Sequence, residues 1–185
     1  MEKKKRIEVV IPCYNEEECI PLIYQSIHEV AKKLSGYQVS ILYVDDGSRD
    51  SSFTKIKEVS EHADENEVHY ISFARNFGKE AAIYAGLKNS TADYIALMDA
   101  DLQHPPELLL EMVKGIEEGY ECCGARRVNR NGEPPIRSAF SRLFYSMASK
   151  MTSTKMEQGT TDYRLMSRKF VDAVLAIGEK NRFTK

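Results

Sequence analysis

The chain has 185 residues, 42% hydrophobic and 29% charged, which is typical of one globular domain with a sizeable core. Its formal net charge of -2 excludes the overall basic field that binding to duplex nucleic acid usually requires. No apolar run reaches the roughly 18 residues of a membrane-spanning helix, and the start MEKKKRIEVVIP has too few apolar residues for a signal peptide.

Short apolar runs alternate along the chain with segments of helical spacing. The runs, predicted to be strands, are residues 7–12, 39–46, 68–73, 94–99 and 120–125. Apolar side chains fall on one helical face within residues 20–34, 53–59 and 108–116. Because the apolar runs are continuous, they suit strands buried on both faces of a parallel sheet. The sequence therefore predicts a single α/β domain over residues 1–185, a Rossmann-like, mostly parallel sheet flanked by helices.

Polar and charged residues follow every predicted strand, in the sequences CYNEEE, DDGSRDSS, ARNFGKE, DADLQHPPE and RRVNRNGEPP. In an open parallel sheet, ligands bind at the carboxyl ends of the strands, where the strand order reverses. We therefore expect the functional site at this edge. The four cysteines form no CxxC pair and no zinc-like spacing with histidine, so we interpret them as reduced thiols of an intracellular protein.

The sequence DADLQ supplies the strongest candidate for a metal site. In an extended segment residues i and i+2 point the same way, so Asp99 and Asp101 could face one cation. With the amide oxygen of Gln103 they form a hard oxygen set, which suits Mg2+ or Mn2+ better than zinc or copper. The alternative is a solvated turn without a ligand.

Three further strand ends carry candidate ligand-binding residues. Asp45 and Asp46 could accept hydrogen bonds from a base or a ribose hydroxyl, or form a plain Asp/Gly turn. Tyr14 could stack on a base or pack in the core. The loop that leads into an alanine-rich helix could bring Arg75 and Lys79 to a diphosphate. It is not a Walker A loop, which disfavours ATP hydrolysis.

Residues 126–155 form a basic stretch with apolar residues at helical spacing and a single acid, Glu133. Its basic residues are Arg126, Arg127, Arg130, Arg137, Arg142, Lys150 and Lys155. Such a stretch is typical of a helix packed on its own core, and it can also lie on an anionic membrane surface. The apolar face could equally join copies of the chain in a homo-oligomer.

Five motifs together carry a family resemblance. They occur in the order VVIPCYNEEECI, YVDDGSRDSS, ARNFGKEAAIYAGL, LMDADLQHPPE and TTDYRLMSRK. In this combination the chain resembles a family 2 glycosyltransferase with the GT-A fold, over nearly its whole length. It is most similar to the polyprenyl-phosphate glycosyltransferases, such as dolichol-phosphate mannose synthases and undecaprenyl-phosphate glucosyltransferases.

The resemblance implies a donor site at the ends of the predicted strands. Asp99, Asp101 and Gln103 would hold Mg2+ or Mn2+ on the diphosphate of a nucleotide sugar. The nucleoside pocket would be lined by Pro12, Tyr14, Glu16, Asp45 and Asp46.

The resemblance also implies a catalytic set that includes Asp101 and extends toward the C-terminus. Arg126 would meet the phosphates of donor or acceptor, while Asp162 and Arg164 fall where the family places acceptor-side residues. The family inverts the anomeric carbon by in-line displacement of the nucleoside diphosphate. With a phosphate monoester as acceptor, Asp162 would orient a substrate. With a sugar hydroxyl, it would have to act as general base.

The expected activity is therefore metal-dependent, inverting transfer of a hexose from a UDP- or GDP-sugar to a polyprenyl phosphate. Membrane-bound relatives continue into C-terminal spanning helices, so we expect a truncated domain of a protein anchored at the cytoplasmic face of the membrane. One alternative is a surface-glycan or polysaccharide hydroxyl acceptor, against which the absent tryptophan of a QxxRW motif argues. Another is a non-catalytic fragment that only binds nucleotide sugars.

Overall fold

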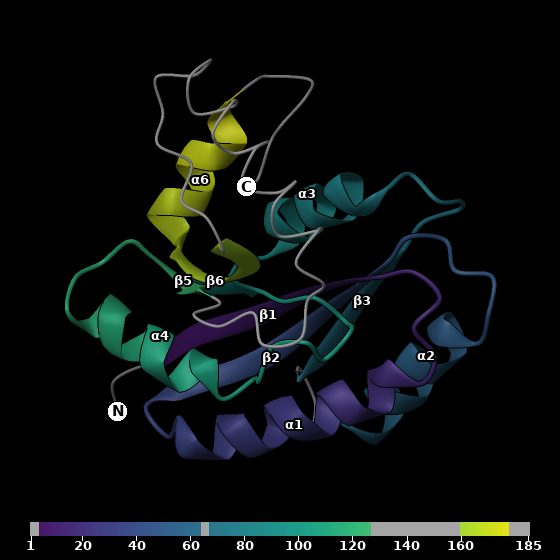
Figure 1. Ribbon diagram of the computed structural model, residues 1–185, viewed down its shortest axis with the longest axis horizontal. Coiled ribbons are helices and arrows are strands. Elements are labelled where there is room, and N and C mark those ends of the chain that lie inside the picture. Colours follow the sequence, from purple (N-terminus) through teal and green to yellow (C-terminus); the bar gives the residue numbers. More distant parts are fainter. Residues whose placement is uncertain (1–3, 64–66, 127–159, 178–185) are drawn as a thin grey trace, which may run out of the picture.

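The computed structural model describes residues 4–63, 67–126 and 160–177, which are arranged around one six-stranded sheet (Figure 1). The strands are β1 (Lys5–Cys13), β2 (Tyr37–Asp45), β3 (Val68–Ser72), β4 (Tyr94–Leu97), β5 (Cys122–Arg126) and β6 (Thr160–Ser167). The helices are α1 (Cys19–Lys33), α2 (Ser52–His62), α3 (Lys79–Asn89), α4 (Leu108–Glu117) and α6 (Arg168–Ala176). The strand order is β3-β2-β1-β4-β6-β5.

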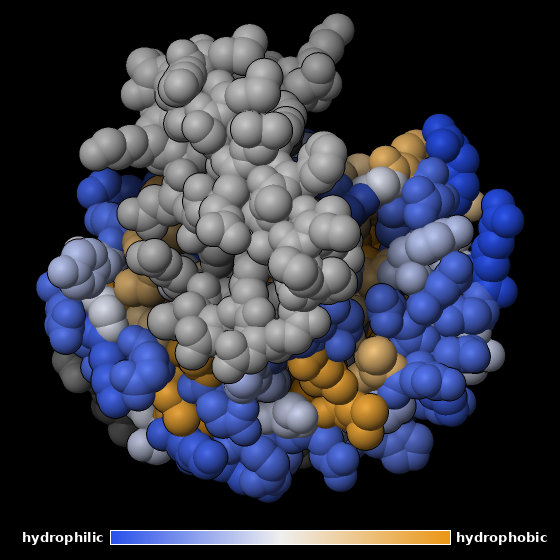
Figure 2. Space-filling view, viewed as in Figure 1, coloured by the Kyte–Doolittle hydropathy of each residue, from blue (hydrophilic) through white to orange (hydrophobic). Residues whose placement is uncertain are grey.

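Helices cover both faces of the sheet. In Figure 1, α3 and α6 lie on one side, and α1, α2 and α4 lie on the other. Each face has its own buried cluster, because successive residues of a strand point to opposite faces. In β1, for example, Val10 packs in the cluster under α3 while Val9 and Ile11 pack in the cluster under α1 and α4. Figure 2 shows that the described surface on the viewed side is mostly hydrophilic.

The predicted fold class is confirmed, and so are the five predicted strands, with shifts at their ends. β1, β2, β3 and β4 are mutually parallel neighbours, as the continuous apolar runs indicated. The helical faces predicted within residues 20–34, 53–59 and 108–116 belong to α1, α2 and α4. The sequence reading missed β6, which runs antiparallel to both β4 and β5.

Helix α3 packs unusually close to the sheet. A Cβ atom added to Gly86 would lie 2.3 Å from Cγ1 of Val10, so only glycine allows this approach. The helix also begins after Gly78, which has a φ of 98° that other residues rarely adopt. These two glycines fix where the first turn of α3, and therefore Lys79, stands relative to β1.

The sequence predicts no membrane-spanning helix, and it predicts a basic stretch that could face a membrane or join copies of the chain. Among them, no helix is both long and apolar enough to cross a bilayer. The basic stretch of residues 126–155 lies outside the described residues except for Arg126, whose backbone ends β5. The predictions of a membrane-facing helix and of a homo-oligomer therefore stay predictions.

Candidate functional site

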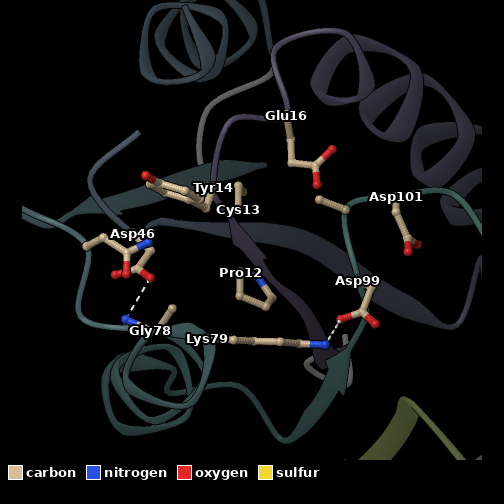
Figure 3. A pocket seen from close by; sticks show the side chains of 12 residues that line it. Pro12, Cys13, Tyr14, Glu16, Asp46, Gly78, Lys79, Asp99 and Asp101 are labelled. Atoms are coloured by element: carbon tan, nitrogen blue, oxygen red, sulfur yellow. Dashed lines mark hydrogen bonds and ion pairs between the residues drawn. The ribbon is translucent and has the colours of Figure 1, made fainter. Parts of the chain in front are cut away.

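A pocket of about 300 Å3 opens at the carboxyl ends of β1 and β4 (Figure 3). The strand order reverses here, because β2 and β3 extend the sheet on one side of β1 and β4 lies on the other. This is the position expected for a ligand in an open α/β sheet. The pocket is lined by Pro12, Cys13, Tyr14, Glu16, Asp46, Asn76, Gly78, Lys79, Ala82, Asp99, Ala100 and Asp101.

The unequal lengths of β1 and β4 open the crevice. The β1–β4 ladder ends with Val10 opposite Leu97, followed by a hydrogen bond from the Met98 N–H to the Val10 carbonyl. β1 nevertheless continues to Cys13, beside β2. Pro12 is two residues beyond Val10, so its nitrogen faces the side where β4 has already ended. A proline is tolerated there because no ladder hydrogen bond requires its missing N–H.

The two aspartates of the DADLQ sequence both line the pocket, although not in the predicted way. β4 ends at Leu97, so Asp99 lies in the loop that follows and Asp101 lies in a turn, and neither is part of an extended strand. Asp101 accepts a hydrogen bond from the Gln103 N–H at 3.1 Å, and Leu102 between them has a positive φ of 55°. This conformation is costly for leucine and indicates a tightly constrained turn. The side chain of Gln103 is exposed and does not line the pocket.

Lys79 forms ion pairs both with the loop after β4 and with β6. Its Nζ lies 2.6 Å from Oδ1 of Asp99 and 2.8 Å from Oδ2 of Asp162. Figure 3 shows the side chain reaching across the pocket from α3 toward Asp99. Burial lowers the pKa of Lys79, but the hydrogen bonds and charges of Asp162 and Asp99 outweigh it and hold this pKa above 10.5. The ammonium group is therefore charged at neutral pH.

The acceptor-side pair predicted from TTDYRL lies beside the pocket rather than in its lining, with Asp162 in contact with Lys79. Asp162 and Arg164 are two residues apart in β6, so they point to the same face of the sheet. Nη2 of Arg164 lies 3.8 Å from Oδ1 of Asp162. Tyr163 points to the opposite face, where it is buried and donates a hydrogen bond to the Pro106 carbonyl at 2.9 Å. Tyr163 thereby anchors the strand to the loop before α4.

Asp46 has a local role that the sequence did not reveal. It is only 3% exposed, and its two carboxylate oxygens accept hydrogen bonds from the backbone N–H groups of Phe77 at 2.7 Å and Gly78 at 2.8 Å. These contacts hold the loop that leads into α3. Asp46 lines the pocket as predicted, but its geometry is that of a residue that positions Lys79.

Asp45 is similarly occupied. It is 2% exposed and accepts hydrogen bonds from the Ser48 N–H at 3.1 Å and the Ser72 hydroxyl at 2.9 Å. It does not line the pocket. The predicted role of Asp45 in nucleoside binding stays a prediction.

The loops after β1 and β2 are clamped to each other, which fixes the wall that carries Tyr14 and Glu16. The Glu16 N–H donates to the Ser52 hydroxyl at 2.7 Å, and the Arg49 N–H donates to Oδ1 of Asn15 at 2.9 Å. Asn15 has a positive φ of 57°, which turns the chain immediately after Tyr14. Tyr14 is left 39% exposed at the pocket, as expected of a ring available for stacking.

Two further predicted residues, Arg75 and Arg126, are not placed at the pocket by the described structure. Arg75 is exposed, with its guanidinium 4.0 Å from the centre of the Phe77 ring. The side chain of Arg126 lies outside the described part of the structure. Conversely, Asn76 lines the pocket, although nothing in the sequence marks it as a binding residue except its place between Arg75 and Gly78.

The carboxylates at the pocket suit a hard divalent cation that is coordinated by the protein and by a substrate together. Within the described residues, no group of three His, Cys, Asp or Glu side chains could hold a metal on its own. Asp99 and Asp101 contribute two carboxylates to one pocket, and Mg2+ is typically bound by one or two carboxylates plus substrate phosphates. The residues present therefore fit Mg2+ or Mn2+ in the presence of a diphosphate.

Comparison with known proteins identifies the family. The model of glycosyl transferase family 2 matches residues 8–175. The chain belongs to glycosyl transferase family 2. It is 42% identical over 183 residues to CsbB of Bacillus subtilis (strain 168), covering 99% of this chain and 54% of CsbB. It is 34% identical over 180 residues to the bactoprenol glucosyl transferase of Shigella phage SfX, covering 97% of this chain and 58% of the phage protein.

The chain thus spans little more than half the length of these relatives.

Solved structures confirm the expected GT-A fold. The mannosyltransferase PcManGT from Pyrobaculum calidifontis, in complex with GDP-Man and Mn2+, is similar with a TM-score of 0.65 at 19% identity, covering 94% of this chain and 47% of that one. Glucosyl-3-phosphoglycerate synthase from Mycobacterium tuberculosis, with Mn2+, UDP-Glc and phosphoglyceric acid, gives 0.64 at 18% identity, covering 89% and 57%.

Proposed function

We propose that this family 2 chain transfers a hexose from a UDP- or GDP-sugar to a polyprenyl phosphate, with inversion and with a divalent cation. The observation that carries the proposal is the convergence of Lys79, Asp99 and Asp101 at one pocket, at the switch point of the sheet. Asp162 of β6 lies beside this pocket, in an ion pair with Lys79. The lipid acceptor is supported by similarity to proteins named bactoprenol glucosyl transferase. Such an acceptor would place the reaction at a membrane, for which we propose the cytoplasmic face.

In this proposal Asp99 and Asp101 hold Mg2+ or Mn2+. When bound, the cation would neutralise charge that develops on the leaving diphosphate. Tyr14 and Glu16 border the part of the pocket that is open for a nucleoside, and the clamp between the β1 and β2 loops keeps them in place. The nucleoside wall is therefore rigid before a donor arrives.

Asp162 is better placed to orient a substrate than to remove a proton. One of its oxygens lies 2.8 Å from Nζ of Lys79, and the other lies 3.8 Å from Nη2 of Arg164. A carboxylate engaged by two cations is poorly arranged to approach a hydroxyl proton. A phosphate monoester needs no such base, because it is already anionic near neutral pH, whereas a sugar hydroxyl would need one.

The donor site can be tested by calorimetric titration of UDP and of GDP, each with and without Mn2+. We expect one of the two nucleotides to bind in a metal-dependent way to the wild-type chain and to lose this binding in Asp101→Ala. Asp172→Ala, on the exposed surface of α6, is the matched control and should bind as wild type does. Metal-independent binding that Asp101→Ala leaves unchanged would contradict the cation site.

The acceptor and the role of Asp162 need a second assay. We expect donor turnover with an undecaprenyl phosphate acceptor, with Asp162→Asn keeping measurable activity and a flat pH profile through the carboxylate range. A nearly inactive Asp162→Asn, with turnover only on a sugar hydroxyl, would refute the lipid-phosphate acceptor. Tight nucleotide binding without turnover on either acceptor would leave a binding function only.

A further inference from the structure

The ion pairs of Lys79 connect groups that the proposed function assigns to different substrates. Asp99 belongs to the proposed cation site, Asp162 belongs to the proposed acceptor side, and Lys79 comes from the first turn of α3. The Lys79 ammonium lies 2.6 Å from Asp99 and 2.8 Å from Asp162. One ammonium group thus contacts two carboxylates, one from β6 and one from the loop after β4.

This arrangement creates a competition at Asp99. A divalent ion bound to a carboxylate lies about 2.0–2.1 Å from its oxygen. Because the ammonium is already 2.6 Å from Oδ1 of Asp99, an incoming ion must share this carboxylate with another cation at close range. The side chain of Lys79 is 46% exposed, so it has room to move away, but only if another anion can take the place of Asp99.

The alternative anion is the donor itself. Lys79 lines the same pocket as Asp99 and Asp101, so a diphosphate held there would lie within the reach of the ammonium. Moving the ammonium to the phosphates would release Asp99 for the metal. A diphosphate would also add oxygen ligands to the cation, so the two effects would act in the same direction.

We propose that Lys79 is a resident counter-cation that weakens divalent metal binding until a nucleoside diphosphate enters the pocket. The inference rests on the proposed function, since it assumes that Asp99 and Asp101 form the cation site. Metal and nucleotide then bind with positive coupling, and part of this coupling is due to Lys79. By linkage, each ligand raises the affinity for the other by the same factor.

The test measures Mn2+ affinity by electron paramagnetic resonance, first without nucleotide and then with saturating UDP or GDP. The variants are Lys79→Met, which removes the charge at similar length, and Lys79→Arg, which keeps it. The control is Lys88→Met, nine residues further along α3 and about 13 Å away along the helix axis. Lys88 is exposed near the end of the helix, over the ring of Tyr84.

Without nucleotide, we expect Lys79→Met to bind Mn2+ about tenfold tighter than wild type. Lys79→Arg and Lys88→Met should remain within about threefold of wild type. The factor by which nucleotide raises Mn2+ affinity should be smaller in Lys79→Met than in wild type. A residue that only ties α3 to β6 would give the opposite result, because its loss would loosen Asp99 and leave Mn2+ affinity unchanged or lower.

The outcomes separate this inference from the proposed function. Metal-dependent nucleotide binding that is lost in Asp101→Ala, with Mn2+ affinity unchanged in Lys79→Met, would overturn the role of Lys79 and leave the proposed function standing. Absence of Mn2+ binding to wild type even with nucleotide would overturn the cation site, and the role of Lys79 with it. Mn2+ binding that is tighter in Lys79→Met, but not in Lys79→Arg or Lys88→Met, would support the inference.

Discussion

Replacing Asp46 by asparagine separates a positioning role from direct contact with a nucleotide. The two carboxylate oxygens of Asp46 each accept one backbone hydrogen bond, from Phe77 and from Gly78, and the residue is 3% exposed. Asparagine has the same shape but only one oxygen. Its amide group would therefore face one of the two N–H donors, so that one buried hydrogen bond is lost and one donor is left unsatisfied.

The magnitude follows from the type of bond. A hydrogen bond to a charged group contributes about 1.5–3 kcal/mol, so we expect Asp46→Asn to lower the free energy of unfolding by about 2 kcal/mol. In a chain of this size that corresponds to a fall in Tm of about 4–8 °C. Because the affected loop leads directly into Lys79, which lines the pocket, we also expect nucleotide affinity to decrease, without being abolished.

Thermal and urea unfolding followed by circular dichroism would measure the effect, with Asp172→Asn as the exposed control. Asp172 forms an exposed i,i+4 ion pair with Arg168 at 3.6 Å, so its substitution should change stability by less than about 0.5 kcal/mol. An Asp46→Asn chain with wild-type Tm but no nucleotide binding would refute the reasoning. It would show that Asp46 contacts the ligand and that the two backbone hydrogen bonds contribute little.

Two further substitutions test the packing and the loop clamp. Gly86→Ala should lower Tm, because its Cβ would lie 2.3 Å from Val10 and overpacking costs about 1–3 kcal/mol, partly offset by about 1 kcal/mol of helix propensity. Gly36→Ala, with no atom within 4 Å of the added Cβ, is the control, and equal Tm values for the two would contradict the close approach of α3. Burial raises the pKa of Asp50, but hydrogen bonds from Ser52 and Glu17 outweigh it and hold this pKa below 3.8. The stabilisation from Asp50 is therefore complete above about pH 5 and is lost as the pH falls through the lowered pKa. The difference in unfolding free energy between wild type and Asp50→Asn should accordingly shrink in acid titrations. A difference that stays constant with pH would contradict this role of Asp50.

The parallel part of the fold could be predicted from the sequence because its signals are local. Continuous apolar runs mark strands buried on both faces, and the polar residues after them mark the edge where a ligand binds. The places of Tyr14, Glu16, Lys79, Asp99 and Asp101 at the pocket follow from that edge alone. Each of these residues follows the end of a strand in the sequence, and that position was sufficient to predict that they gather at one edge.

The remaining features depend on contacts between distant parts of the chain. The sequence of β6 mixes polar and apolar residues and gives no signal of its antiparallel pairing with β4 and β5. Likewise, the sequence near Asp46 does not show that its carboxylate accepts hydrogen bonds from the backbone of Phe77 and Gly78. The sequence near Lys79 does not show that its ammonium group pairs with two carboxylates. Such hydrogen bonds and ion pairs are set by tertiary packing, which local patterns do not encode.

The place of β6 in the sheet affects how the chain folds during synthesis. β6 lies between β4 and β5 although it follows both of them in the chain. During synthesis, β4 is therefore an open edge until β6 emerges, and open edges invite pairing with other chains. Closing this gap requires non-local contacts, which form slowly. Asp162 lies on the strand that closes this gap, so the ion pair between Lys79 and Asp162 can form only when the edge of β4 has been covered.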